Sequence, residues 1–221
     1  MNIKHIAMNY DKVLYLACND ISEDLEEQKF TENQIGLFTH IVEEFKKHLD
    51  YTPIFHLLNT SGVLNYPRAQ FDMVRIGIGL YGFGNDPIET KQLKNTHNLK
   101  SIISQIHSIE PGQTVGYNRA FVAKKKTLIA TIPIGHADGI SRKLGNQKGN
   151  VLIQNQKAKI IGNVCMDMIM VDVTKIECTE GDEVTVFNSQ QMIQEIADIA
   201  TTIPYETLTG ISQRVHKIFK Q

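Results

Sequence analysis

The residues best suited to chemistry lie at 133–139, where the chain reads Pro-Ile-Gly-His-Ala-Asp-Gly. His136 follows an apolar run and stands between two glycines, Gly135 and Gly139. Glycine allows the sharp backbone turn that presents a side chain to a pocket, and imidazole gains and loses a proton readily near neutral pH. The pattern therefore predicts that His136 is a catalytic base. Two alternatives stay open: a structural histidine in a loop, and a metal-binding pair with Asp138.

A second segment of this kind, residues 164–168, reads Val-Cys-Met-Asp-Met and also follows an apolar strand pattern. On their own, Met166 and Asp167 are ordinary core and turn residues. Cys165 is expected to be a small buried hydrophobe rather than a nucleophile. The segment alone therefore assigns no chemistry.

Polar residues with chemical potential also occur in the first half of the chain. Asn59 and Thr60 begin the run Asn-Thr-Ser-Gly after a short apolar strand pattern, and Arg75 precedes Gly77 and Ile78 in a glycine-rich apolar run. Taken alone, Asn59 and Thr60 suit a helix cap. Arg75 alone could belong to a buried ion pair.

The composition narrows the class of protein. The chain has 221 residues, of which 42% are hydrophobic and 21% charged, and its formal net charge is −1. A nucleic-acid partner is not expected because there is no basic excess, and the lysines at 124–126 suit a solvated hairpin end. No apolar run reaches transmembrane length and the first residues do not open a signal peptide, so neither a membrane partner nor export is expected. The protein is therefore expected in the cytosol. The three cysteines are odd in number and widely spaced, so neither a disulfide framework nor a zinc site is expected.

The first half of the chain has the pattern of α/β units. Apolar residues at three- and four-residue spacing predict a helix over 31–50, with Thr31 as its cap. Short and glycine-rich apolar runs predict buried strands at 54–58 and 73–81. Helix, strand, short helix and strand in succession indicate parallel units of an α/β barrel.

The second half has the pattern of an all-β domain. Residues 85–98 are polar and lack periodicity, which predicts a linker between a domain at 1–84 and one at 99–221. Alternating apolar residues then predict many short strands and one late helix over 192–200, typical of a compact, barrel-like β domain. The predicted strands are 102–109, 127–134, 151–154, 157–164, 169–173 and 183–187.

Seven motifs, in order, resemble those of the alanine racemase family from about residue 30 to the end of the chain. The resemblance implies the C-terminal βα units of a TIM-like pyridoxal-phosphate barrel, followed by the family's β-barrel-like domain. The residues around Arg75 and His136 most resemble those in the racemase half of Bacteroidetes proteins that fuse a muramoyl-peptide ligase to the racemase. The motifs are Asn-Thr-Ser-Gly at 59–62, the Arg75 run at 71–78, residues 112–117, 133–139, 164–168, 181–184 and 203–206.

The resemblance assigns roles in binding the cofactor, pyridoxal 5'-phosphate. Arg75 matches the arginine that contacts the pyridine nitrogen. Asn59, Thr60, Gly77 and Ile78 match positions that hold the phosphate, where the family more often has serine in place of Thr60.

On the substrate side, His136 stands where most members have the tyrosine that exchanges the α-proton. Histidine is a chemically reasonable replacement, because its ordinary pKa lies near neutrality whereas that of tyrosine lies far above it. Met166 matches the residue whose amide helps to bind the substrate carboxylate, and Asp167 lines the entrance. The resemblance further implies a cytosolic homodimer with active sites shared between subunits, which interconverts L- and D-alanine for peptidoglycan.

The chain also departs from the family pattern. Members carry a Schiff-base lysine on the first barrel strand, and neither Lys4 nor Lys12 has flanking residues of that kind. Tyr15 replaces a common histidine, and Gln213 replaces a tyrosine near the phosphate. We therefore expect an N-terminally shortened member without the lysine, inactive alone. The rival hypothesis is a non-catalytic fragment or pseudoenzyme that keeps the dimer surface.

Overall fold

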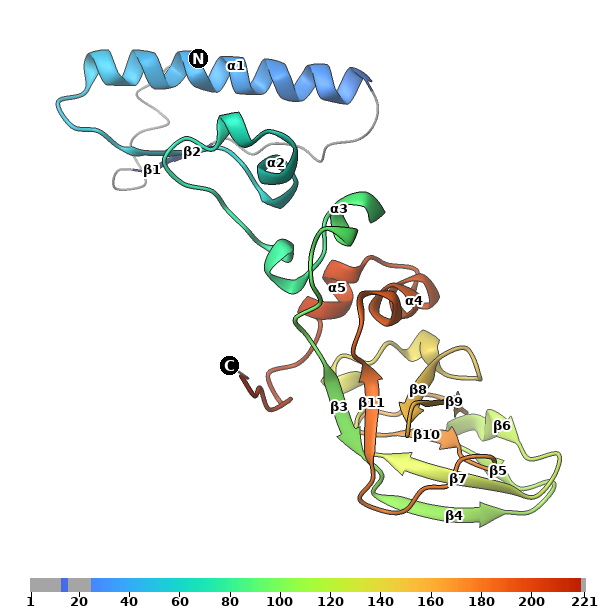
Figure 1. Cartoon of the computed structure of the whole chain (residues 1–221). Coiled ribbons are helices and arrows are strands. Elements are labelled where there is room, and N and C mark those ends of the chain that lie inside the picture. The colour runs from blue at the N-terminus through green and yellow to red at the C-terminus, as the bar shows by residue number, and fades with distance from the viewer. Residues whose placement is uncertain (1–12, 16–24, 220–221) are drawn as a thin grey trace. The chain divides into compact units, whose positions relative to one another are not determined.

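The computed structural model describes residues 13–15 and 25–219, and the chain divides into two units at residues 1–96 and 97–221 (Figure 1). Lys4 and Lys12 lie outside the described residues. Among those described, no helix combines the length and the apolar character that a membrane crossing requires.

The first unit is organised around helix α1 (Leu25–His48). The predicted start of this helix at Thr31 is wrong: the helix begins six residues earlier, and Thr31 is buried within it. Residues 25–29 are good helix formers without a breaker, so the helix extends through the expected cap. One face of α1 packs on the chain around residues 55–58. The shared core contains Ile35, Phe38, Val42 and Phe45 of the helix with Phe55, Leu57, Leu58, Tyr66 and Ala69.

Short parallel strands run beneath this helix (Figure 1). Strand β1 (Val13–Tyr15) pairs in parallel with β2 (Ile54–His56), and His56 forms a parallel bridge to Met73. Helix α2 (Thr60–Asn65) follows β2. Parallel strands with intervening helices confirm the α/β class for this half of the chain.

The predicted buried strand at 73–81 is largely wrong. Only its first residues lie beside β2, where the Arg75 amide donates to the Leu58 carbonyl at 2.9 Å. Residues 78–81 form the 3₁₀ helix η3 (Ile78–Tyr81), and Leu80 is 64% exposed. The glycines explain the difference, because glycine weakens a strand and the amides of Gly77 and Gly79 donate to the Thr60 hydroxyl oxygen.

A short helix, α3 (Pro87–Lys91), lies within the segment predicted as a linker. Its cap is Asp86, whose carboxylate accepts the amides of Ile88 and Glu89. Glu89 is itself buried and accepts hydrogen bonds from the Ser61 hydroxyl at 2.7 Å and the Asn85 amide at 2.8 Å. The carboxylate of α3 therefore ties this helix to the first turn of α2.

The second unit contains an antiparallel seven-stranded sheet in the order β3-β11-β8-β9-β10-β7-β4. All six predicted strand regions are occupied by these strands. Inward residues alternate along them, and the valines and isoleucines of β8, β9 and β10 are almost fully buried. The strands are β3 (Leu99–Ile102), β4 (Gln105–Ile109), β7 (Thr127–Ile132), β8 (Asn150–Ile153), β9 (Gln156–Ile161), β10 (Ile169–Asp172) and β11 (Glu183–Phe187).

The two edge strands of this sheet are consecutive in the chain. β3 turns a corner into β4 (Figure 1) with only Ile103 and Ser104 between them. The Ile103 amide donates to the Asp182 carbonyl and the Ser104 amide to the Thr131 carbonyl, each at 2.9 Å. One bent strand thus joins both edges, which confirms the barrel-like β domain. A small hairpin of β5 (Thr114–Val115) and β6 (Phe121–Val122) lies outside this sheet.

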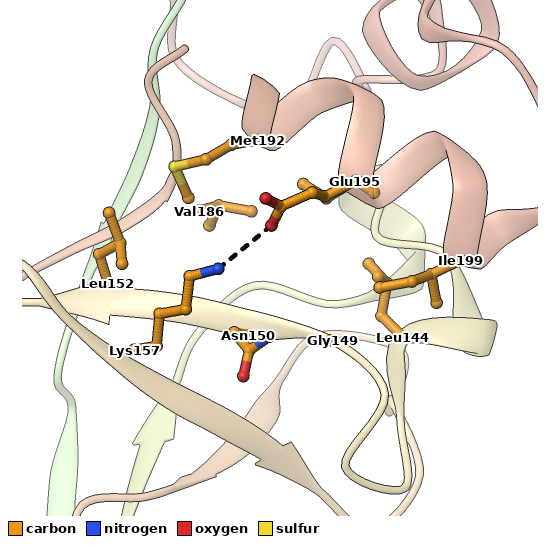
Figure 2. A pocket seen from close by; sticks show the side chains of 10 residues that line it. Leu144, Gly149, Asn150, Leu152, Lys157, Val186, Met192, Glu195 and Ile199 are labelled. Atoms are coloured by element: carbon orange, nitrogen blue, oxygen red, sulfur yellow. Dashed lines mark hydrogen bonds and ion pairs between the residues drawn. The ribbon is translucent and has the colours of Figure 1, made fainter. Parts of the chain in front are cut away.

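Two helices complete the unit. Helix α4 (Gln190–Ala200) agrees with the predicted late helix, whereas α5 (Pro204–Thr209) was not predicted. Figure 2 shows Lys157 of β9 reaching Glu195 of α4 across a small hollow, where they form an ion pair of 3.3 Å. The hollow has a volume of about 20 Å³, which is room for a single water.

Candidate functional site

The loop that carries His136 follows β7 directly. Residues 136–138 form the 3₁₀ helix η5 (His136–Asp138), and Gly139 ends it with a φ of +106°, a conformation that favours glycine. The Asp138 carboxylate accepts a hydrogen bond from the Gly135 amide at 2.8 Å, which stabilises the turn of the loop. The His136 side chain is exposed to solvent. The imidazole is therefore presented to solvent on a backbone held by hydrogen bonds, and its role as a catalytic base stays a prediction.

Backbone hydrogen bonds join this loop to the segment that carries Met166. The His136 amide donates to the Cys165 carbonyl at 2.9 Å, and the Ala137 amide donates to the Met166 carbonyl at 3.0 Å. A Cβ at Gly135 would lie 2.3 Å from the Met166 carbonyl oxygen, so the close approach requires glycine. The structure thus brings His136 and Met166 together from segments 30 residues apart.

An arginine that sequence reasoning missed connects the same two segments. The Arg214 guanidinium donates from Nη2 to Asp167 Oδ1 at 2.7 Å, and its Nε lies 3.6 Å from Asp138 Oδ1. The hydrogen bond to Asp167 and the charge of Asp138 raise the pKa of Arg214. Both Asp138 oxygens thus face protein groups, and among the described residues no cluster of three His, Cys, Asp or Glu side chains is arranged to hold a metal ion.

One feature of the composition could have drawn attention to Arg214. Only five of the 23 basic residues are arginines, and the other 18 are lysines. Arginine has a planar fork of donors that can serve two carboxylates at fixed geometry, which lysine cannot do. A rare arginine in a lysine-rich chain is therefore worth testing for such a role.

The polar residues of the first unit meet around Thr60. The Thr60 hydroxyl oxygen accepts the amides of Gly77 and Gly79 at 3.3 and 3.2 Å. These hydrogen bonds hold the start of η3 against the start of α2. Asn59 is the cap of α2, and its side chain accepts the Gly62 amide at 2.9 Å. The helix-cap role considered for Asn59 is therefore present.

Arg75 is half-buried in the same unit. Its Nη2 donates to the Leu57 carbonyl at 2.7 Å. His56 is buried nearby, and burial lowers the pKa of its imidazole, with a smaller contribution from the positive charge of Arg75. No atom lies within 4 Å of the position a Cβ would take at Gly77, so its backbone can be approached closely. A guanidinium and a hydroxyl beside an open glycine backbone suit a phosphate-bearing ligand.

The predicted site residues therefore form two groups, one in each unit. Within each group the structure places them together. Asn59, Thr60, Arg75, Gly77 and Ile78 belong to the first unit, and His136, Met166 and Asp167 belong to the second.

Comparisons with known proteins agree on one family. The family model described as "Alanine racemase, C-terminal domain" matches residues 96–219, and "Alanine racemase, N-terminal domain" matches residues 11–85. The alanine racemase of Halothermothrix orenii is 38% identical over 216 residues, covering 95% of this chain and 57% of that protein. That of Vesicomyosocius okutanii is 41% identical over 184 residues, covering 83% of this chain and 51% of that protein.

Solved structures give the same result. Alanine racemase of Clostridium difficile 630 in complex with cycloserine has a TM-score of 0.80 at 31% identity, covering 92% of this chain and 54% of that one. The Bartonella henselae enzyme with covalently bound pyridoxal phosphate has a TM-score of 0.74 at 29% identity, covering 94% and 56%. The chain spans about half the length of the relatives that it matches.

Proposed function

Because the chain belongs to the alanine racemase family, we propose that it forms part of a pyridoxal-phosphate enzyme that interconverts L- and D-alanine. The observation that carries the proposal is the pairing of the His136 loop with the Met166 segment through two backbone hydrogen bonds. In this proposal, the pairing would set His136, as the proton-transfer side chain, beside the segment that would bind the substrate carboxylate.

The first unit supplies the proposed cofactor contacts. When bound, pyridoxal phosphate supplies an electron sink that makes the α-hydrogen of an amino acid acidic. Thr60 and the backbone of Gly77 and Ile78 would hold the phosphate, and Asn59 would hold the start of α2 in place. Arg75 would face the ring nitrogen. Because an arginine does not give up its proton, Arg75 would leave the ring nitrogen unprotonated and the bound cofactor would be a weaker sink, which would favour racemisation over transamination.

The second unit supplies the proposed substrate contacts. A nitrogen of the His136 imidazole would take the α-proton of L-alanine and return a proton in the reverse direction. The Met166 amide would bind the substrate carboxylate, and Asp167 would line the entrance. The exposure of His136 and Met166 supports this assignment, because a base buried in its own unit could not reach a substrate.

The proposal extends to assembly and place of action. Both groups of residues would meet across a homodimer, in which the β domain of one subunit covers the barrel of the other. The D-alanine would serve peptidoglycan synthesis in the cytosol. Free thiols at Cys165 and Cys178 are compatible with that compartment.

The Schiff-base lysine provides the test. We expect this chain, mixed with pyridoxal phosphate, to show no borohydride-fixed attachment to a single lysine and negligible racemisation. A longer protein that contains this sequence and also a Schiff-base lysine on the first barrel strand, the form that carries a barrel lysine, should racemise alanine. Cofactor binding without any racemisation in that form would instead favour the rival hypothesis, a non-catalytic module.

A further inference from the structure

We propose that Arg214 is a positioning residue for the proposed racemisation, a clamp that holds the His136 loop against the Met166–Asp167 segment. The inference rests on the proposed function for its catalytic meaning and on the geometry of the second unit for its physical basis.

The guanidinium contacts both segments at once. Its Nη2 hydrogen bond of 2.7 Å reaches Asp167, next to the proposed carboxylate-binding Met166. Its Nε lies 3.6 Å from Asp138, whose other oxygen closes the His136 loop. Asp138 is only 8% exposed, so its contact with Arg214 is less screened by solvent than a surface pair.

The backbone around Arg214 is fixed to the same loop. The Ser212 amide donates to the Asp138 carbonyl at 3.1 Å, and the Ser212 hydroxyl accepts the Arg214 amide at 3.2 Å. A Cβ at Gly139 would lie 2.5 Å from the Gly210 carbonyl oxygen, so the segment at 210–214 lies directly on the loop. The backbone that carries Arg214 is therefore tied to the His136 loop.

The charge of Arg214 has a second consequence. Without it, Asp138 and Asp167 would leave two uncompensated carboxylates beside the proposed site of a carboxylate-bearing substrate. Like charges oppose binding, so the clamp would both set the loop geometry and keep the site receptive to an anion.

These two effects can be separated by substitution. Arg214→Ala removes the clamp and the charge, whereas Arg214→Lys keeps the charge but not the two-armed geometry. The double variant Arg214→Ala/Asp167→Asn removes the clamp and one of the carboxylates. Arg142→Ala, an exposed arginine of the same unit, is the matched control.

The first measurement is amide hydrogen exchange by NMR on the full chain, which needs neither cofactor nor activity. Exchange at the His136 and Ala137 amides should be about three- to tenfold faster in Arg214→Ala and Arg214→Lys, and unchanged in Arg142→Ala. Amides of the β8–β9 hairpin report whether the unit remains folded. Unchanged exchange at His136 and Ala137 in the lysine variant, with the hairpin intact, overturns the clamp.

The second measurement is racemisation in the form that carries a barrel lysine. We expect KM for alanine to rise about tenfold in Arg214→Ala and much less in Arg214→Lys and in the double variant. An equal rise in all three overturns the charge role. If the parent form does not racemise at all, the proposed function fails, but the exchange result still decides whether Arg214 is a clamp.

Discussion

The proposed base differs from the residue usual in the family, and this difference makes it testable. In the form that carries a barrel lysine, His136→Ala should lower the rate of racemisation roughly 10²- to 10⁴-fold, because a general base is lost while the cofactor contacts in the first unit stay intact. The most direct measurement is exchange of the α-hydrogen with solvent deuterium. Exchange from L-alanine should collapse, whereas exchange from D-alanine, handled by a lysine, should persist.

The control for this substitution is His107→Ala, an exposed histidine of the same unit outside the proposed site. It should leave exchange from both substrates unchanged. Equal loss from both enantiomers in His136→Ala, or loss from neither, would mean that His136 is the structural loop histidine considered above.

A buried histidine of the first unit leads to a prediction about pH. Burial, and secondarily Arg75, lowers the pKa of His56 in the folded state. The unfolded chain therefore binds more protons at this group, so the stability contributed by neutral His56 is lost as pH falls below its unfolded pKa of about 6.5. Urea unfolding can be monitored by the helical circular dichroism signal at pH 7 and at pH 5. Between these two pH values, the free energy of unfolding should fall less in His56→Gln than in the parent protein.

His40→Gln is the comparison, because His40 is exposed on α1. It should keep the full pH dependence of the parent. A His56→Gln variant that loses as much stability on acidification as the parent would place the titration elsewhere.

At the scale of elements, α1 offers two neighbouring apolar residues in opposite environments. Phe38 is fully buried in the core of the first unit and contacts Phe71 edge-on with ring centres 4.9 Å apart, whereas Leu37 is 56% exposed. Phe38→Ala should lower the free energy of unfolding of this unit by about 3–5 kcal/mol. Leu37→Ala should change it by less than about 0.5 kcal/mol. Chemical denaturation of both variants checks the pair, and similar losses would contradict the observed orientation of the helix.

Most strands of the large sheet could be predicted because their signal is local, whereas β3 before Ile102 and the two-residue strands β5 and β6 were missed. β8 and the start of β11 bury alternate residues, and a slip of one residue would turn that face to solvent. The prediction of a strand at 73–81 was wrong because a run of apolar residues with few charges indicates burial but does not distinguish a strand from a helix. The true path of this run depends on Thr60, a residue more than a dozen positions away that takes the Gly77 and Gly79 amides.

The candidate site shows the same division. Both segments of the second-unit site could be found from the sequence, since each carries its polar residues beside glycines or at a strand end. The scarcity of arginine in the sequence could single out Arg214 but not its contact, because its partner Asp167 is 47 residues away and no local pattern predicts the pairing. Local periodicity thus predicts helices and strands, whereas hydrogen bonds between distant loops depend on the tertiary structure.

At the scale of the whole chain, the two units should differ in stability. The second contains a sheet whose edges are joined, whereas the described strands of the first form a two-stranded pair with apolar residues such as Ile76 and Leu80 exposed nearby. A two-stranded pair is marginal by itself. Limited proteolysis of dilute chain should cut within residues 25–96 before it cuts within 99–219. Equal protection of both units would contradict the domain boundaries proposed from the sequence.

The corner between β3 and β4 also has a consequence for the order in which the chain folds. β3 pairs with β11, and Leu99 lies opposite Phe187, so this ladder forms only after more than 80 further residues have been synthesised. The β8–β9 hairpin needs only its own two-residue turn. Local hairpins form before distant pairings because closing a long loop costs more entropy. Until β11 has emerged from the ribosome, β3 and β8 lack their shared neighbour and expose unpaired strand edges. We expect the nascent chain to be most prone to aggregation at this stage of synthesis.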